Sequence, residues 1–160
     1  MSLGNSPDAM VLLERYGADG VRFGMLSSAA AGNDIIFDAP IDPETKKARN
    51  ESKLCDQGRR FCNKLINANR LLQGWTQVAR DPTEAEQIAA DWLEARLSQT
   101  IEQVNVAFDD YRLSDAVMSL YKFIWGDFCS LYLEIVKPTD GEISQATYDR
   151  TIAAFEQMMS

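Results

Sequence analysis

The sequence predicts an all-α protein, an antiparallel helical bundle preceded by two short helices and a loop. Three observations lead to this fold class. The chain has 160 residues, of which 46% are hydrophobic, and this is enough to fill one core. Four segments after residue 50 repeat apolar residues every three or four positions. Short polar turns separate these segments, and helices joined in this way pack antiparallel. We therefore expect a linker over residues 1–50 and the bundle over residues 51–160.

The linker begins with signals for two short helices. Ser6-Pro7-Asp8 is typical of a helix start, with serine as the N-cap and proline at the first helical position, and Gly17 ends this helix. A second short helix follows and ends in the run of small residues 27–32. The loop that comes next extends to Arg49 and contains two prolines, with a brief extended segment expected over residues 35–37.

The bundle helices are expected over residues 51–78, 83–108, 114–136 and 144–159. The third and fourth begin at serines, which are typical N-caps. The residues expected to face the core are Leu54, Gly58, Phe61, Leu65, Ala68, Leu72 and Trp75 in the first helix, Ile88, Trp92, Leu93, Leu97, Ile101, Val104 and Phe108 in the second, Val117, Leu120, Tyr121, Ile124, Trp125, Phe128, Leu131, Tyr132 and Ile135 in the third, and Tyr148, Ile152, Phe155 and Met159 in the fourth.

Composition excludes several classes of function. The chain has no histidine, which removes the commonest general base and metal ligand. Its three cysteines form no CxxC pair, so we expect reduced thiols that fill the core of a cytoplasmic protein. No apolar run is long enough for a membrane span. We therefore expect no catalytic residue, no metal site and no membrane contact.

Basic residues are concentrated in one part of an acidic chain. The whole sequence has 16 basic and 24 acidic residues, a net charge of minus 8. Residues 46–70 hold eight of the basic residues and two of the acidic ones, so this segment carries plus 6 and the rest of the chain minus 14. A polyanionic partner is therefore expected at this segment alone.

The first bundle helix carries a polar stripe about 100° from its apolar face. Cations and amides in this arrangement suit contacts to phosphates and to the exposed base edges of a single-stranded RNA loop. The alternative is a solvated face whose cations pair with acids on neighbouring helices. No carboxylate interrupts the stripe, which consists of Lys53, Gln57, Arg60, Lys64, Asn67 and Leu71, with Asn63 and Arg70 alongside.

Five segments in order along the chain resemble class I aminoacyl-tRNA synthetases. Residues 2–8, SLGNSPD, resemble the sequence that continues the KMSKS signature, and residues 16–23, YGADGVRF, resemble the next block of the valine, isoleucine and leucine enzymes. Residues 32–38, GNDIIFD, favour the valyl-tRNA synthetases among these. Residues 60–68, RFCNKLINA, resemble the RNFCNKLWNA block of that family, and residues 128–137, FCSLYLEIVK, its FCDWYLELTK block.

The resemblance implies the linker after the KMSKS motif and the helical anticodon-binding domain of a valyl-tRNA synthetase. It implies two partners, a valine-accepting tRNA and the catalytic domain of the same parent chain. ATP with magnesium would serve that catalytic domain, and the segment itself would need no cofactor. Without the catalytic domain, we expect Leu12, Val21 and Phe23 to be exposed.

Carried over position by position, the resemblance assigns contacts with the anticodon loop to Lys64 and Arg70, with Lys53 as a further candidate. Family members often have Arg-Phe where this chain has Arg70-Leu71, and leucine offers apolar contact without a π-face for stacking. The predicted anticodon-binding residues are Lys53, Arg60, Asn63, Lys64, Asn67, Arg70 and Leu71.

The expected function is recognition of a tRNA anticodon in support of the ATP-dependent attachment of valine to its tRNA by a full-length ligase in the cytoplasm, with no DNA partner. Two alternatives stay open. One is a helical protein-interaction module with an acidic docking surface, in which acids from other helices cover the polar stripe. The other is the equivalent domain of an isoleucyl- or leucyl-tRNA synthetase.

Overall fold

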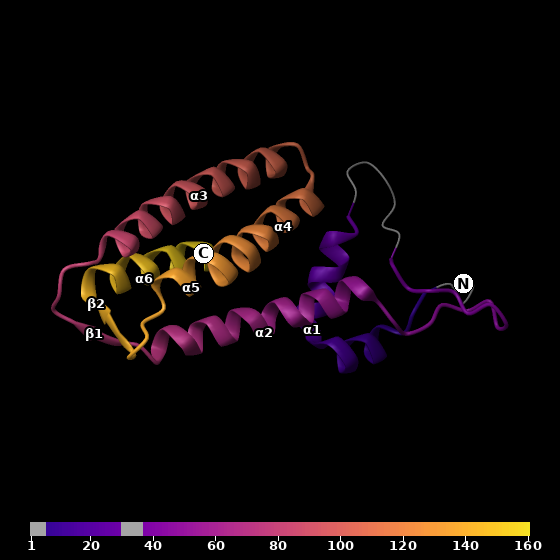
Figure 1. Cartoon of the computed structure of the whole chain (residues 1–160). Helices are drawn as coiled ribbons and strands as arrows, with labels where there is room; N and C mark the ends of the chain where they lie inside the picture. The colour runs from indigo at the N-terminus through magenta and orange to yellow at the C-terminus, as the bar shows by residue number, and fades with distance from the viewer. Residues whose placement is uncertain (1–5, 30–36) are drawn as a thin grey trace. The chain divides into compact units, whose positions relative to one another are not determined.

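A computed structural model of the chain describes residues 6–29 and 37–160. Its elements are almost all helices (Figure 1), which confirms the predicted all-α class. The backbone contacts divide the chain into two compact units. The first unit contains the described residues up to Asn63 together with Ala107–Met118, and the second contains Lys64–Val106 and Ser119–Ser160. Of the resemblance segments, residues 2–5 and 32–36 lie outside the described residues, as do positions 35 and 36 of the predicted extended segment.

In the first unit, helix α1 (Ala9–Ser27) consists of two helical halves, as predicted. They meet at Gly17, whose φ of 75° and ψ of 161° are not helical and suit a residue without Cβ. The predicted N-cap is wrong by two positions. Asp8, not Ser6, caps the helix, because its carboxylate accepts from the backbone N–H of Met10 at 2.8 Å.

Side chains at the start of helix α2 (Lys53–Gln73) hold its first turn in place. The Ser52 hydroxyl accepts from the backbone N–H of Cys55 at 2.9 Å and donates to the Asp38 carboxylate. Asp38 in turn accepts from the backbone N–H of Leu54 at 3.0 Å. The helix therefore begins two residues after the predicted position, where these acceptors satisfy its free N–H groups.

Helices α1 and α2 approach each other closely within the first unit. Gly24 lies against Cys55, and Gly58 lies against Phe23, so that a Cβ at either glycine would meet its neighbour at 2.6 Å. Leu12 and Phe23 are buried, and the expectation that both are exposed is wrong, because residues of this same chain cover them. The exposed apolar residues of α1 are instead Met10, Val11, Leu13, Met25 and Leu26.

Helix α2 ends at Gln73, although the sequence predicts that it continues to Val78. The backbone N–H of Gly74 still donates to the Arg70 carbonyl, and the chain then becomes extended as strand β1 (Thr76–Val78). This strand pairs in parallel with β2 (Glu142–Ser144), and the local sequence pattern predicts neither strand.

Two further helices belong wholly or mainly to the second unit, and their caps explain where they begin. Helix α3 (Glu84–Asp109) starts with a capping box, in which Thr83 and Glu86 each accept a hydrogen bond from the backbone N–H of the other. Helix α6 (Gln145–Met159) begins at the predicted cap, Ser144, whose hydroxyl accepts from the Thr147 N–H at 3.1 Å.

The third predicted helix is divided in three. Helix α4 (Leu113–Lys122) begins before Ser114, so the predicted serine cap there is wrong. It continues as the π-helix η1 (Phe123–Tyr132) and ends as α5 (Leu133–Val136). The wider turn of a π-helix changes which side chains share a face. Leu131 and Ile135, both expected in the core, are consequently exposed.

In the second unit, η1 packs against α6. Phe128 stacks on Phe155, with ring centroids 5.7 Å apart, and the buried Tyr132 hydroxyl lies 2.6 Å from that of Thr151. The prediction of core positions for Ile88, Phe108 and Met159 is wrong, since all three are more than half exposed. Their neighbours Ala89 and Ala107 are buried, so Ile88 and Phe108 lie on the solvent face of α3, whereas Met159 is the last residue of α6. No helix among the described residues is long and apolar enough to cross a membrane.

Candidate nucleic-acid interface

The predicted interface residues all lie on α2, and most are open to solvent. Lys53, Arg60 and Asn63 belong to the part of α2 in the first unit, and all three are exposed. The second-unit part carries the other four residues. There Asn67 and Arg70 are exposed, whereas Lys64 and Leu71 are half-buried.

In the first unit, a carboxylate next to the stripe neutralises part of it. Asp56 accepts from Arg60 at 2.7 Å and from Arg59 at 2.9 Å. The hydrogen bond from Arg59, followed by the nearby charge of Arg60, lowers the pKa of Asp56 against the opposing effect of burial. Arg60 is thus a paired cation, although the stripe itself contains no carboxylate. The pairing acid comes from the same helix, not from a neighbouring one as the docking alternative requires.

Cations without an ion-pair partner are concentrated in one segment. Among the described residues, most arginines outside α2 are paired, for example Arg150 with Asp91 at 2.6 Å and Arg96 with Asp127 at 2.8 Å. The cations that form no ion pair with a described carboxylate are Lys46, Lys47, Lys53, Lys64, Arg70 and Lys122, and all but Lys122 fall within residues 46–70. The unbalanced positive charge therefore lies in the basic segment that the charge pattern of the sequence indicates.

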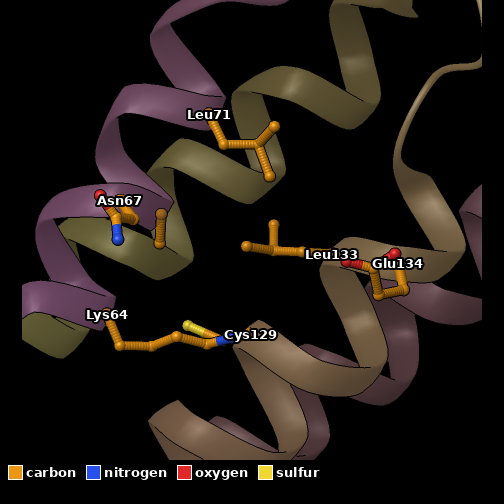
Figure 2. A pocket seen from close by; sticks show the side chains of 7 residues that line it. Lys64, Asn67, Leu71, Cys129, Leu133 and Glu134 are labelled. Carbon is orange, nitrogen blue, oxygen red and sulfur yellow. The ribbon is translucent and has the colours of Figure 1, made fainter. Parts of the chain in front are cut away.

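A pocket of about 120 Å³ opens beside α2 in the second unit. Figure 2 shows side chains of α2 on one side and those of η1 and α5 on the other. The helices bring together three predicted residues and four that were not predicted to act there. The lining consists of Lys64, Asn67, Ala68 and Leu71 from α2, Cys129 from η1, and Leu133 and Glu134 from α5.

Lys64 is held in position by an aromatic ring. Its Nζ lies 5.6 Å from the centroid of the Trp125 ring, a distance at which an ammonium group is attracted to the ring face. Trp125, expected in the core, is half-buried and stacks on Tyr121 at 5.7 Å. The lysine thus points toward η1 and the pocket (Figure 2), and no described carboxylate forms an ion pair with it.

The chemistry of the pocket is that of binding. Burial raises the pKa of the Cys129 thiol, and the charge of Lys64 opposes this only in part, so the thiol stays protonated and poorly nucleophilic at neutral pH. No group of three or more Cys, Asp or Glu side chains among the described residues is placed to hold a metal ion. The lysine, amide and carboxylate groups of the lining, together with its apolar side chains, can instead bind a small planar ligand.

Sequence reasoning missed Cys129, Leu133 and Glu134 as pocket residues. They fall in the last of the five segments of the family resemblance, residues 128–137, but nothing in the helical spacing connects them with α2. Only the packing of the two helices shows that they face Lys64 and Asn67.

The known proteins to which the chain is similar all point to one family. Residues 90–160 match a family model described as the anticodon-binding domain of tRNA ligase. The valine–tRNA ligase of Parabacteroides distasonis is 46% identical over 161 aligned residues, and that of Phocaeicola vulgatus is 44% identical over 159. Each alignment covers 99% of this chain and 17% of the relative. The valine–tRNA ligase of a Synechocystis strain is 37% identical over 144 residues, 86% of this chain and 15% of that protein. The chain thus spans about a sixth of the length of these relatives.

Proposed function

Because the chain belongs to the valine–tRNA ligase family, as a segment that includes its anticodon-binding domain, we propose that it recognises the anticodon stem and loop of a valine-accepting tRNA. The observation that carries this proposal is the α2 face, where Lys64, Arg70 and Asn67 lie free of acidic partners among the described residues, beside a pocket. The chain contributes binding energy and discrimination to the reaction of a longer ligase.

Electrostatics supports this assignment. RNA binding requires cations that no carboxylate neutralises, because a cation that contacts a phosphate must take the place of a counterion on the RNA. The chain retains such cations mainly within residues 46–70. Its acidic groups elsewhere pair with other arginines or face solvent, which directs a polyanion toward α2 and away from the rest of the surface.

Within the proposal, Lys53, Lys64 and Arg70 contact phosphates or bases, Asn63 and Asn67 hydrogen-bond base edges, and Leu71 offers an apolar contact. Arg60 can contribute only after it exchanges Asp56 for a phosphate. Residues 51–160 are proposed as the anticodon-binding domain and residues 1–50 as the linker that connects it to the catalytic domain. The family model itself matches only from residue 90 onward, so the role of α2 rests on the geometry and on the resemblance.

The parent ligase is proposed to attach valine to its tRNA in the cytoplasm with ATP and magnesium. Those reactants would bind to other parts of the ligase, and no described residue of this chain is assigned to them.

The proposal is tested by fluorescence anisotropy with a labelled valine anticodon stem-loop and the 160-residue chain. Lys64→Ala and Arg70→Ala should each weaken binding by about 1–3 kcal/mol if the side chains touch bases. Lys122→Ala removes a lysine that forms no ion pair with a described carboxylate and lies outside residues 46–70; it is the matched control, for which we expect only a small loss. Equal affinity of the wild type, Lys64→Ala and Arg70→Ala would contradict the site assignment.

A further inference from the structure

We propose that a hairpin in the first unit, residues 40–49, is a second RNA-binding element, whose Lys46 and Lys47 contact phosphates of the tRNA without reading its sequence. This inference rests on the proposed function, which brings an RNA to the chain, and it names a further surface for that RNA. The hairpin precedes α2 and lies outside the predicted anticodon-binding residues.

Backbone hydrogen bonds close the 40–49 hairpin. The N–H of Arg49 donates to the carbonyl of Pro40, and the N–H of Asp42 donates to the carbonyl of Lys47, both at 2.8 Å. An isolated antiparallel bridge joins the two arms between these hydrogen bonds. The segment therefore has a defined turn, and its side chains keep fixed places on the backbone.

One carboxylate organises the turn of the hairpin. Asp42 accepts from the backbone N–H of Glu44 at 3.0 Å and from that of Thr45 at 2.9 Å. Its other oxygen accepts from the guanidinium of Arg49 at 2.9 Å. The hydrogen bond from Thr45, followed by that from Arg49, lowers the pKa of Asp42 to about 2. The carboxylate thus stays ionised at neutral pH, and Arg49 stays paired with it.

This arrangement leaves two neighbouring lysines without a partner of opposite charge. Lys46 and Lys47 are exposed, and neither forms an ion pair with a described carboxylate. Lys46 has a φ of 58°, in the left-handed region that a residue with a long side chain rarely adopts. Its N–H donates to the carbonyl of Asp42 at 2.9 Å, which holds the backbone in this conformation. The hairpin therefore presents two adjacent positive charges.

The other cations of the first unit are already neutralised. Its described arginines all have a carboxylate partner, for example Arg15 with Glu51 and Arg112 with Asp110. Apart from the two hairpin lysines, only Lys53 among the described residues of this unit forms no ion pair with a described carboxylate. A polyanion that contacts the first unit thus has the hairpin as its strongest point of attraction.

The chemistry of the hairpin suits phosphates and not base edges. A lysine ammonium is a compact charge that donates hydrogen bonds and has no planar group to match to a base. Residues 40–49 include no amide and no aromatic side chain, and their one arginine is paired with Asp42. Because bases are read mainly by bidentate or stacking side chains, contact with the phosphate backbone is the interaction that these lysines can make.

The test measures binding of a valine tRNA transcript to the 160-residue chain by filter binding over a range of salt concentrations. Lys46→Gln and Lys47→Gln each keep a long polar side chain but remove the charge. Each should weaken binding by about two- to fivefold near 0.1 M salt. Each should also reduce the slope of log affinity against log salt by about 0.9, the value for one neutralised phosphate in a duplex.

Lys122→Gln is the matched control, because it removes an exposed lysine of the second unit that also forms no ion pair with a described carboxylate. We expect it to change the affinity by less than about twofold and to leave the slope unchanged. Circular dichroism checks that each variant is folded. If Lys46→Gln and Lys47→Gln behave like Lys122→Gln, the hairpin contact is overturned.

A variant with the opposite expected sign excludes damage to the fold as the cause. Glu44 is exposed on the same hairpin and would repel a phosphate held by the lysines. Glu44→Gln should therefore tighten binding by about two- to fivefold, a gain that partial unfolding would not produce. Glu156→Gln, at an exposed position of α6, is its control and should have a smaller effect. Equal effects of the two glutamate variants would contradict the proposal.

A transcript with a scrambled anticodon loop separates this inference from the proposed function. Because phosphates carry no sequence, the two lysine variants should weaken both transcripts equally and keep the wild-type ratio of affinities. A changed ratio would overturn contact without sequence reading. If the wild type binds the two transcripts equally, the proposed function fails, whereas a lower salt slope in the lysine variants still supports the hairpin contact. If the wild type binds neither transcript, both fail.

Discussion

The close approach of α1 and α2 predicts that an alanine at Gly58 destabilises the protein, although alanine ordinarily favours a helix. In a helix interior, Gly→Ala stabilises by about 1 kcal/mol. At Gly58, however, the new Cβ would lie 2.6 Å from the Cβ of Phe23 and 2.9 Å from the carbonyl oxygen of Gly20. Carbon atoms pack best at about 3.5–4.0 Å, so the helices must separate by roughly an ångström.

Overpacking of this kind costs typically 1–3 kcal/mol, and the cost is at the upper end here because the atoms that clash are backbone or directly attached to it. After the helix-forming gain of about 1 kcal/mol is subtracted, we expect a net loss of about 1–2 kcal/mol. For a chain of this length the midpoint of thermal unfolding should fall by about 3–6 °C. Circular dichroism in the far ultraviolet measures it.

Gly126 provides the matched control, because it is also helical and a Cβ built there meets no atom within 4 Å. Gly126→Ala should therefore raise the midpoint by about 2–3 °C. If Gly58→Ala raises it by a similar amount, the two helices do not approach as closely as described. The packing that fixes the Lys53–Asn63 part of α2 would then need another explanation.

Two further predictions concern buried titratable groups. Glu86 is buried, and hydrogen bonds from Arg80 lower its pKa against the effect of burial, so its contribution to stability is present above the unfolded-state pKa and is lost as pH falls through the folded-state pKa. Glu86→Gln should lower the free energy of unfolding at neutral pH by about 1–3 kcal/mol, measured by urea titration. The free energy of unfolding of this variant should also decline less than that of the wild type as the solution is acidified to about pH 4. An equal decline in both proteins would contradict this role of Glu86. Burial raises the pKa of Cys55, Cys62 and Cys129, so a colorimetric disulfide reagent near neutral pH should react slowly with the native chain and rapidly with all three thiols in denaturant. Immediate reaction of all three native thiols would contradict the burial of Cys55 and Cys129.

Local signals in the sequence were sufficient for most helices. Ser144 caps α6 as predicted, and α3 begins one residue from its predicted start, because caps and turn residues act within a few positions. The strands β1 and β2 were missed because each is three residues long and pairs with a segment far away in the sequence. The π-helix η1 was missed because its residues keep an apolar pattern that also fits an α-helix.

The candidate site was predictable on one side only. Lys64, Asn67 and Leu71 follow a helical spacing that places them on one face of α2, and this face does line the pocket. Glu134 lies on a different helix, and its place opposite Asn67 depends on tertiary packing that no local pattern encodes. The ion pair between Asp56 and Arg60 was predictable from the sequence, by contrast, because the two residues are four positions apart on the same helix.

Comparison of the affinities of the wild-type chain for the valine anticodon stem-loop and for a scrambled loop of the same length, at low and at moderate salt, tests the central claim most directly. The account predicts tighter binding of the valine loop at both salt concentrations. It also predicts that the logarithm of each affinity falls linearly with the logarithm of the salt concentration, by about 0.7 for each single-strand phosphate that α2 neutralises. Equal affinity for the two loops, or binding that does not weaken as salt is added, would contradict recognition of an anticodon by the free cations of α2.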